Sequence, residues 1–214
     1  MSLNQQVMIA LPKGRLYDQA RGLLARAGIM MPESDNGSRK LVVSDASGRF
    51  DFVSLKPVDI PVYVESGAID AGIVGTDILR EIESDVYEPV DLKIGVCRLV
   101  VAAPSDRELP LSQMVCIATK YPRTAERFFR GRNAHVHIVK LEGSVEIAPL
   151  LGLADAIVDL VETGRTLREN GMRVVEEVAA VSAKLIVNRT AMKMKSAAIN
   201  HLITQLDAVV YEHR

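Results

Sequence analysis

Short apolar runs alternate with amphipathic stretches along the chain. The apolar runs are rich in β-branched residues and predict buried strands at 7–11, 40–44, 50–55, 71–74, 99–103, 115–119, 136–140, 156–161 and 184–187. Two stretches have helical spacing instead, with one apolar face each, at Leu16, Ala20, Leu23, Leu24 and Ala27 before Gly28, and at Met194, Ala198, Leu202, Leu206 and Val209. We expect both helices to be half buried. Strands separated by helices are typical of an α/β fold with largely parallel sheets.

The length and the apolar content allow one large core or two small ones. Of the 214 residues, 48% are hydrophobic, so disorder is not expected. No stretch rich in Gly, Ser or Pro marks a domain boundary, and the sequence alone is compatible with a single domain. No apolar run reaches the roughly 18 residues that span a bilayer, and residues 1–6 lack the pattern of a signal peptide. We therefore expect a soluble, cytoplasmic protein without membrane contact.

Charge, cysteine and histidine usage argue against several classes of function. A net charge of −1 and 4% aromatic residues give neither a basic field nor stacking platforms, so nucleic-acid binding is not expected. Cys97 and Cys116 have apolar neighbours and no Cys-x-x-Cys spacing, which predicts reduced thiols in a core. His135 and His137 share a strand face but have no third ligand nearby, so we predict no metal site in the protein itself.

A small turn after a buried strand is the clearest candidate for a binding site. Residues 155–167 read Asp-Ala-Ile-Val-Asp-Leu-Val-Glu-Thr-Gly-Arg-Thr-Leu. The turn can direct backbone N–H groups and two hydroxyls at one anion, and it consists of Thr163, Gly164, Arg165 and Thr166. A helix beginning near Leu167 would favour the same anion through its dipole. The pattern predicts a phosphate site.

Two carboxylates accompany this turn. Asp155 and Asp159 lie two strand periods apart and are acceptors suited to the hydroxyls of a sugar. A phosphate and a diol together indicate phosphoribose. The ordinary alternative stays open, because Thr-Gly turns are common and acidic residues often rim strand ends without binding anything.

Basic residues follow the first strand and recur later. Lys13, Gly14 and Arg15 come directly after that strand, where the loops of α/β sheets typically face ligands, and Gly14 lets the backbone approach an anion closely. Arg39 and Lys56 are further cations. For any one of them, simple solvation is the alternative interpretation.

These segments resemble one enzyme family, the short form of ATP phosphoribosyltransferase. The turn is similar to the 5-phosphoribosyl 1-diphosphate loop of phosphoribosyltransferases, in which carboxylates precede a Thr-Gly-x-Thr turn. The resemblance includes Ile9-Ala-Leu-Pro-Lys-Gly-Arg-Leu16 and Lys140-Leu-Glu-Gly-Ser-Val-Glu-Ile-Ala-Pro149, and it continues through 59–77, 91–97, 155–170 and 184–188. It implies transfer of phosphoribosyl to N1 of ATP with release of diphosphate, the first step of histidine biosynthesis.

The resemblance also implies a fold. It is a two-lobed α/β fold of the type II periplasmic-binding-protein kind, with an active-site cleft between the lobes. The first lobe would comprise residues 1–94 and 180–214, and the second, residues 95–179, would carry the phosphoribosyl-diphosphate loop.

The roles of single residues follow from the same resemblance. Lys13, Arg15 and Arg39 would be catalytic, and ATP would be bound by Lys13, Gly14, Arg15, Arg39 and Lys56. The phosphoribosyl diphosphate would be bound by Glu142, Asp155, Asp159, Thr163, Gly164, Arg165 and Thr166. Arginine suits this task because its planar fork binds phosphate oxygens in pairs, and many relatives have arginine where this chain has Lys56.

Two glutamates after the strand at 136–140 are distinguished. Glu142 is expected to contact ribose hydroxyls or Mg²⁺-bound water, with helix N-terminal charge complementarity as the alternative. Glu146 is expected to be structural. Mg²⁺ is expected to arrive with the phosphoribosyl diphosphate, because a departing diphosphate and an oxocarbenium-like ribose need charge stabilisation more than a base.

The short form further implies a partner. A regulatory subunit similar to histidyl-tRNA synthetase is expected, with a homodimer of this chain alone and a hetero-octamer with the partner. Two alternatives remain at this point, a non-catalytic two-lobed ligand-binding module and a phosphoribosyltransferase for another base.

Overall fold

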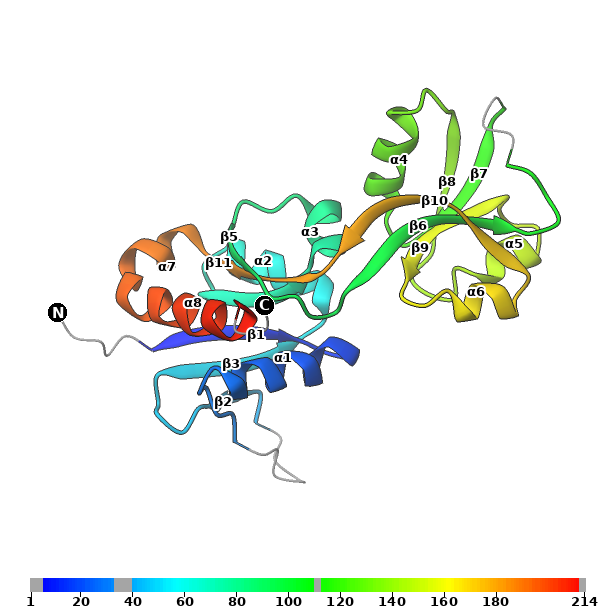
Figure 1. Ribbon diagram of the computed structural model, residues 1–214. Helices are drawn as coiled ribbons and strands as arrows, with labels where there is room; N and C mark the ends of the chain where they lie inside the picture. Colours follow the sequence, from blue (N-terminus) through cyan, green and yellow to red (C-terminus); the bar gives the residue numbers. More distant parts are fainter. Residues whose placement is uncertain (1–5, 33–39, 110–112, 212–214) are drawn as a thin grey trace. The chain divides into compact units, whose positions relative to one another are not determined.

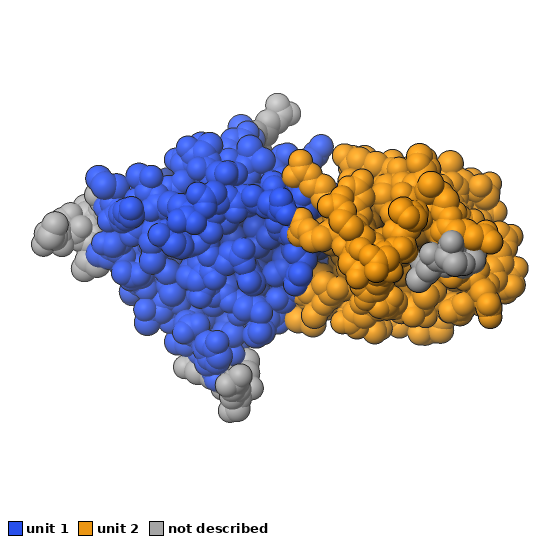
Figure 2. Space-filling model, turned by 90° about the horizontal axis from the view of Figure 1, so that it is seen from above, with its two compact units in different colours: residues 1–95, 182–214 blue, residues 96–181 orange. Residues whose placement is uncertain are grey.

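The computed structural model describes residues 6–32, 40–109 and 113–211 and divides into two compact units. Unit 1 comprises residues 1–95 and 182–214, and unit 2 comprises residues 96–181 (Figure 1, Figure 2). Unit 2 is therefore an insertion into unit 1, and the chain passes from one to the other at Gly95–Val96 and returns at Val181–Ser182.

Unit 1 is built, within the described residues, on a six-stranded sheet in the order β2-β3-β1-β4-β11-β5. Its strands are β1 (Val7–Pro12), β2 (Val42–Ser44), β3 (Phe50–Leu55), β4 (Ala71–Gly75), β5 (Tyr87–Asp91) and β11 (Ala183–Val187). β1 pairs in parallel with β3 and β4, whereas β2, β5 and β11 run antiparallel to their neighbours. The sheet therefore has a parallel centre and antiparallel flanks.

Helices α1 (Arg15–Arg26) and α8 (Ser196–Tyr211) share the apolar core of unit 1 with the strands. The predicted face of α1 is confirmed, since Ala20, Leu23, Leu24 and Ala27 are buried, and Gly28 follows at a positive φ of 75°. The remaining helices of the described unit are α2 (Ile60–Glu65), α3 (Thr76–Ile82), α7 (Arg189–Met194) and a 3-10 turn at Pro57–Asp59.

The second predicted helix is interrupted. α7 ends at Met194, which is 69% exposed, and α8 begins at Ser196. The expectation that Met194 belongs to the buried face was therefore wrong, because its side chain precedes the break in the helical spacing. Leu202, Leu206 and Val209 lie in the core as predicted.

Unit 2 contains, in its described part, a five-stranded sheet in the order β10-β6-β9-β7-β8. Its strands are β6 (Cys97–Pro104), β7 (Val115–Thr119), β8 (Val136–Lys140), β9 (Ala156–Val161) and β10 (Met172–Val181), and its helices are α4 (Pro122–Arg130), α5 (Ile147–Leu150) and α6 (Arg165–Glu169). β7 is parallel to β8 and β9, and β6 is antiparallel to β9 and β10. The strands β7, β8 and β9 match their predicted bounds.

The core of unit 2 fixes the position of α6. Leu167 of α6 and Ala148 of α5 are buried in one apolar cluster with Val100, Ile157 and Val161 of the sheet. α6 is thereby held against the sheet directly after the end of β9. Among the described helices of the chain, none has the length and apolar character that crossing a membrane would require.

Two strands were not predicted. β5 and β10 lie at the edges of the two sheets, and neither has a continuous apolar run. A third strand is shorter than expected, since β2 begins at Val42 and Lys40 and Leu41 stand outside it.

Candidate active site

The carboxyl ends of three parallel strands meet at one edge of the unit 2 sheet. Thr119 ends β7, Lys140 ends β8 and Val161 ends β9. The residues that follow are Lys120, the 141–144 loop and the predicted phosphate turn, so they gather at this edge. Loops at the carboxyl edge of α/β sheets are where ligands usually bind.

The turn has the backbone geometry expected of an anion cradle. Gly164 has a φ of 72° and a ψ of 10°, the left-handed conformation that glycine adopts without strain. The Thr163 hydroxyl accepts a 3.4 Å hydrogen bond from the N–H of Arg165. The side chains of Thr163, Arg165 and Thr166 are exposed. These hydroxyls are therefore accessible to a ligand.

α6 begins at Arg165, two residues earlier than predicted. It has only five residues, so its dipole adds little to anion binding. The Nε of Arg165 donates to Glu169 at 2.7 Å, and both side chains are exposed. Arg165 keeps its charge, and the carboxylate of Glu169 offsets part of its field at the turn.

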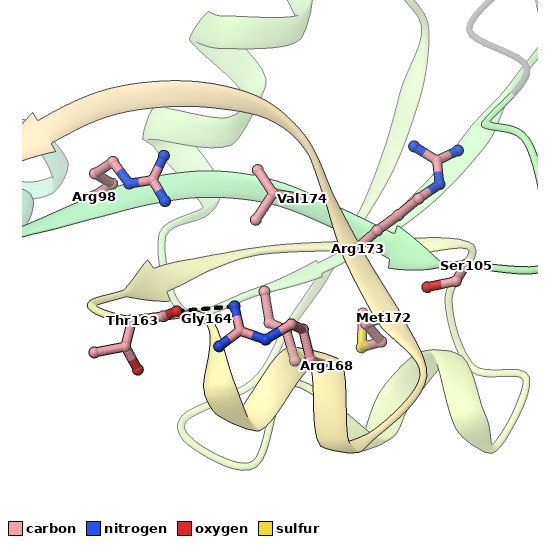
Figure 3. Close-up of a pocket in the computed structure, with 9 residues that line it drawn as sticks. Arg98, Ser105, Thr163, Gly164, Arg168, Met172, Arg173 and Val174 are labelled. Atoms are coloured by element: carbon pink, nitrogen blue, oxygen red, sulfur yellow. Dashed lines mark hydrogen bonds between the residues drawn. The ribbon is translucent and has the colours of Figure 1, made fainter.

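A cavity of about 400 Å³ lies beside the turn (Figure 3). It is lined by Arg98, Ser105, Thr163, Gly164, Leu167, Arg168, Met172, Arg173 and Val174. The Nη1 of Arg168 donates to the carbonyl oxygen of Thr163 at 3.1 Å. Arg98 pairs with Glu177 at 3.4 Å, and Arg173 points its guanidinium away from the turn, toward the carbonyl of Arg107. Arg168 is thus the cation of this cavity that touches the turn.

Asp159 lies on β9 close to its end, on the sheet face that Ile157 and Val161 share. Burial raises the pKa of its carboxyl, and the nearby charge of Glu146 adds to this rise. The N–H of Leu160, which donates at 2.8 Å, and the charge of Lys120 lower the pKa but do not compensate. A partly buried acid beside a second acid favours a ligand that supplies hydroxyl donors or positive charge.

The structure does not bring Asp155 to the turn. Asp155 precedes β9 and accepts a 2.8 Å hydrogen bond from the N–H of Cys116. The six residues of β9 separate it from the turn by about 20 Å. Asp155 and the turn therefore lie at opposite ends of β9, and the predicted contact of Asp155 with the phosphoribosyl diphosphate stays a prediction.

The surroundings of Glu142 and Glu146 differ from those that their predicted roles suggest. Glu142 lies in the loop after β8, is exposed and pairs with Lys140 at 3.0 Å. Glu146, expected to be structural, is the glutamate whose charge acts on Asp159. The sequence did not point to Lys120 or Arg168, and Glu146 was given no ligand role. No local pattern identifies these three residues, because each can equally be an ordinary surface charge.

Unit 1 has a corresponding carboxyl edge. Pro12 of β1 pairs with Leu55 of β3, and the N–H of Lys13 donates to the carbonyl of Leu55 at 2.8 Å. The backbones of Lys13 and Lys56 are therefore neighbours at this edge, and both side chains are exposed.

Gly14 connects this edge to α1. It has a φ of 91°, and its carbonyl accepts the N–H of Tyr17 at 2.9 Å, so only glycine turns here without strain. Arg15 is the first residue of α1 and is exposed. The predicted residue Arg39 lies outside the described residues.

The remaining reactive groups considered in the sequence are two cysteines and two histidines. Cys97 and Cys116 are free thiols, and burial together with the charge of Asp155 raises the pKa of Cys116. His135 and His137 are exposed at β8, the edge strand of its sheet. Within the described residues, no three His, Cys, Asp or Glu side chains are grouped as ligands for a metal ion.

Known proteins similar in sequence to this chain belong to one enzyme family. The family described as HisG, ATP phosphoribosyltransferase, matches residues 56–208. An ATP phosphoribosyltransferase from Thermoanaerobacter sp. (strain X514) is 49% identical over 206 residues, which cover 96% of this chain and 97% of the relative. Another, from Syntrophotalea carbinolica, is 44% identical over 214 residues and covers 98% of both chains.

Solved structures agree in fold. The ATP phosphoribosyl transferase (HisG:HisZ) complex from Thermotoga maritima has a chain with a TM-score of 0.84 and 31% identity, covering 98% of this chain and all of that one. An alkanesulfonate-binding protein from Xanthomonas axonopodis has a TM-score of 0.56 at 13% identity, which shows the fold alone. The predicted two-lobed periplasmic-binding-protein-like α/β fold is thereby confirmed.

Proposed function

The chain belongs to the ATP phosphoribosyltransferase family, and from this premise we propose which of its residues bind the two substrates. The enzyme transfers phosphoribosyl from 5-phosphoribosyl 1-diphosphate to ATP, the first step of histidine biosynthesis. Our proposal assigns the phosphoribosyl diphosphate to the carboxyl edge of unit 2 and the cations that bind ATP to the carboxyl edge of unit 1.

The turn at Thr163–Thr166 carries the first assignment. Its support is the left-handed Gly164 between two exposed threonines at the end of a buried strand. Backbone N–H groups and hydroxyls in such a turn bind a phosphate without a full positive charge of their own. We assign the phosphate of the phosphoribosyl group to this turn.

The ribose needs acceptors next to the phosphate. Asp159 lies four residues before Thr163, and the charge of Glu146 acts on its carboxyl. Two carboxylates held close to one another favour the hydroxyls of a sugar as donors, because each hydroxyl relieves their repulsion. We assign the ribose diol to this pair. Glu142 stays a prediction as a further contact.

The carboxylates at this edge are suited to a Mg²⁺ ion that arrives bound to the substrate. Magnesium in phosphate-binding sites keeps several waters and is held by one or two carboxylates plus substrate oxygens. Asp159 and Glu146 supply up to two carboxylates, and the described residues contain no larger group of ligands. When bound, the ion neutralises charge on the diphosphate.

Unit 1 supplies the cations for ATP in this proposal. Lys13 and Lys56 are exposed at one sheet edge, and Gly14 and Arg15 form the start of α1 beside them. Triphosphate oxygens are bound well by lysine and arginine at such an edge. Arg39 remains a prediction for the same role.

The chemistry explains why cations rather than a base are needed. The N1 lone pair of adenine forms a bond to C1 of the ribose while the bond from C1 to the diphosphate oxygen breaks and the diphosphate leaves with the electron pair. N1 carries no proton to be removed. The protein's part is to orient the two substrates and to stabilise the charge that develops on the departing diphosphate.

One experiment tests the assignment of the phosphoribosyl diphosphate. Diphosphate release by the purified chain is measured with ATP, 5-phosphoribosyl 1-diphosphate and Mg²⁺, with GTP in place of ATP as a control. Gly164→Val should lose binding of the phosphoribosyl diphosphate in titration calorimetry, because a β-branched side chain at a φ of 72° forces the turn to change. Unchanged titration by this variant would move the phosphate site elsewhere.

We also propose a regulatory partner for this chain. The solved relative from Thermotoga maritima is a HisG:HisZ complex, and we propose a HisZ-like subunit, resembling histidyl-tRNA synthetase, that assembles with this chain as a hetero-octamer, with a homodimer in its absence. Light scattering on the co-expressed pair tests the assembly, and separate migration of the two proteins would refute it.

Because both substrates are intracellular phosphate compounds, we propose the cytoplasm as the place of the reaction.

A further inference from the structure

Arg168 contacts the turn at two carbonyl groups. Its Nη1 donates to the carbonyl oxygen of Thr163 at 3.1 Å, and its backbone N–H donates to the carbonyl oxygen of Gly164 at 3.1 Å. Figure 3 shows the guanidinium folded back from α6 onto the turn. One residue thus fixes the two peptide groups on either side of Gly164.

The first of these contacts decides where an N–H group points. The peptide bond between Thr163 and Gly164 is trans, so its C=O and N–H point in opposite directions. Because the carbonyl points at Arg168, the N–H of Gly164 points away from Arg168. No acceptor among the described residues takes this N–H, which leaves it available to a ligand on that side.

The charge of Arg168 is not neutralised by a carboxylate in the described part of the chain, since its side chain donates to a neutral carbonyl. Arg165, three residues earlier, is paired with Glu169 instead. A Cβ at Gly164 would lie 3.2 Å from the Nη1 of Arg168, so the guanidinium lies directly against the turn. Arg168 therefore adds an uncompensated positive charge where an anion would bind.

We propose that Arg168 is a positioning residue for the phosphoribosyl diphosphate, holding the Thr163 carbonyl so that the Gly164 N–H faces the phosphate. This inference rests on the proposed binding of that substrate at the turn. It assigns Arg168 no contact with the reacting atoms. Its effect is on substrate affinity, through the turn.

The test compares two substitutions at Arg168. Arg168→Met keeps the length and the apolar stem but has no donor, whereas Arg168→Lys keeps one donor. Arg168→Met should raise the KM and the calorimetric Kd for the phosphoribosyl diphosphate by about tenfold to a hundredfold, the loss expected for one charge-assisted hydrogen bond. The KM for ATP and kcat at saturating phosphoribosyl diphosphate should stay at wild-type values, and the thermal midpoint should fall by no more than about 4 °C, because the lost bond is exposed. Arg168→Lys should restore part of the affinity.

Arg130→Met is the matched control, because Arg130 is an exposed arginine of the same unit on α4, outside the candidate site. It should leave every one of these quantities unchanged. A wild-type Kd for the phosphoribosyl diphosphate in both Arg168 variants would overturn the inference. If only Gly164→Val then failed to bind the phosphoribosyl diphosphate, the turn would bind this ligand without help from Arg168. Normal binding by Gly164→Val would refute the site itself.

Discussion

At the scale of single residues, Asp159 combines a function with a cost in stability. Its pKa is raised first by burial and then by Glu146, so the folded chain binds its proton more tightly than the unfolded chain does. The stability that this proton provides is complete below the unfolded pKa and declines as the pH rises through the folded pKa. At neutral pH, well above the unfolded pKa, the burial of this acid therefore costs stability in unit 2.

Asp159→Asn should accordingly raise the thermal midpoint at pH 7.5, and the gain should shrink as the pH falls toward 4.5. An asparagine oxygen can still accept the N–H of Leu160, so the substitution removes the charge and keeps that hydrogen bond. Affinity for the phosphoribosyl diphosphate should fall at the same time. Differential scanning fluorimetry across pH, together with calorimetric titration, measures both effects.

Asp106→Asn is the control for this prediction, because Asp106 is an exposed acid of the same unit, 4.0 Å from Arg107. It should change neither quantity. A pH-independent loss of stability in Asp159→Asn would show that the carboxylate is structural and that its burial carries no penalty at neutral pH.

The sequence predicted the two glycines whose backbone conformation has a steric requirement, but it did not distinguish the charged residues near the turn from ordinary surface charges. Gly14 and Gly164 have positive φ angles at strand-to-helix turns, and sequence spacing marked both. Residue type alone did not show that Asp155 lies at the end of β9 away from the turn, or that Glu142 forms an exposed ion pair with Lys140. Arg168 acts by folding back along its own helix, which no pattern of residue types reveals.

At the scale of elements, Asn188 connects α7 to α2 and provides a sharp test of unit 1. Its Oδ1 accepts the N–H groups of Thr190 and Ala191 at 2.9 Å, and its Nδ2 donates to the carbonyl of Val64 at 2.8 Å. The side chain is buried. It therefore satisfies the start of one helix and the end of another at once.

Asn188→Ala should destabilise the chain by about 2–3 kcal/mol, since it removes an N-cap and leaves buried backbone groups without partners. Urea unfolding followed by circular dichroism measures this loss. Asn170→Ala is the comparison, because the amide of Asn170 also donates to a backbone carbonyl, that of Thr166, but is exposed. Equal effects of the two substitutions would contradict the double capping role.

The two strands that were missed are edge strands without a continuous apolar run, whereas β8, also an edge strand, was predicted because Val136, Ile138 and Val139 mark it. β9 and β7 are central strands with nearly continuous apolar runs. β5 reads Tyr-Glu-Pro-Val-Asp and tolerates Pro89 because it is an edge strand. β10 has irregular pairing between Val174 and Glu176 and again between Glu177 and Ala179, so its apolar residues do not alternate regularly.

At the scale of the whole molecule, the sequence contains no linker to reveal the two units. The chain passes between them at Gly95–Val96 and Val181–Ser182, and the flanking residues belong to strands β6, β10 and β11 or lie directly beside them. Gly95 and Ser182 are single residues between strands, so neither boundary has a stretch rich in Gly, Ser or Pro. Only the family resemblance predicted two lobes, which is why composition alone left a single domain open.

Two units with separate cores and separate carboxyl edges allow the substrate assignment to be tested in the intact chain. Hydrogen exchange read by mass spectrometry should show that the phosphoribosyl diphosphate with Mg²⁺ slows exchange at residues 161–168. The Gly164 N–H has no acceptor among the described residues, so a bound phosphate should protect it directly. ATP alone should instead slow exchange at residues 12–16 and 55–57.

The amino end of β8, residues 133–137, serves as the internal reference, since it lies at the opposite sheet edge from the candidate site and should respond to neither ligand. Protection of residues 161–168 by ATP alone would show that the two substrates are not divided between the units as we propose. Protection at both edges by the phosphoribosyl diphosphate alone would show that this ligand recruits the unit 1 cations itself. Lys13, Arg15 and Lys56 would then act on the diphosphate rather than on ATP, because the diphosphate is the part of that ligand whose charge grows as the reaction proceeds.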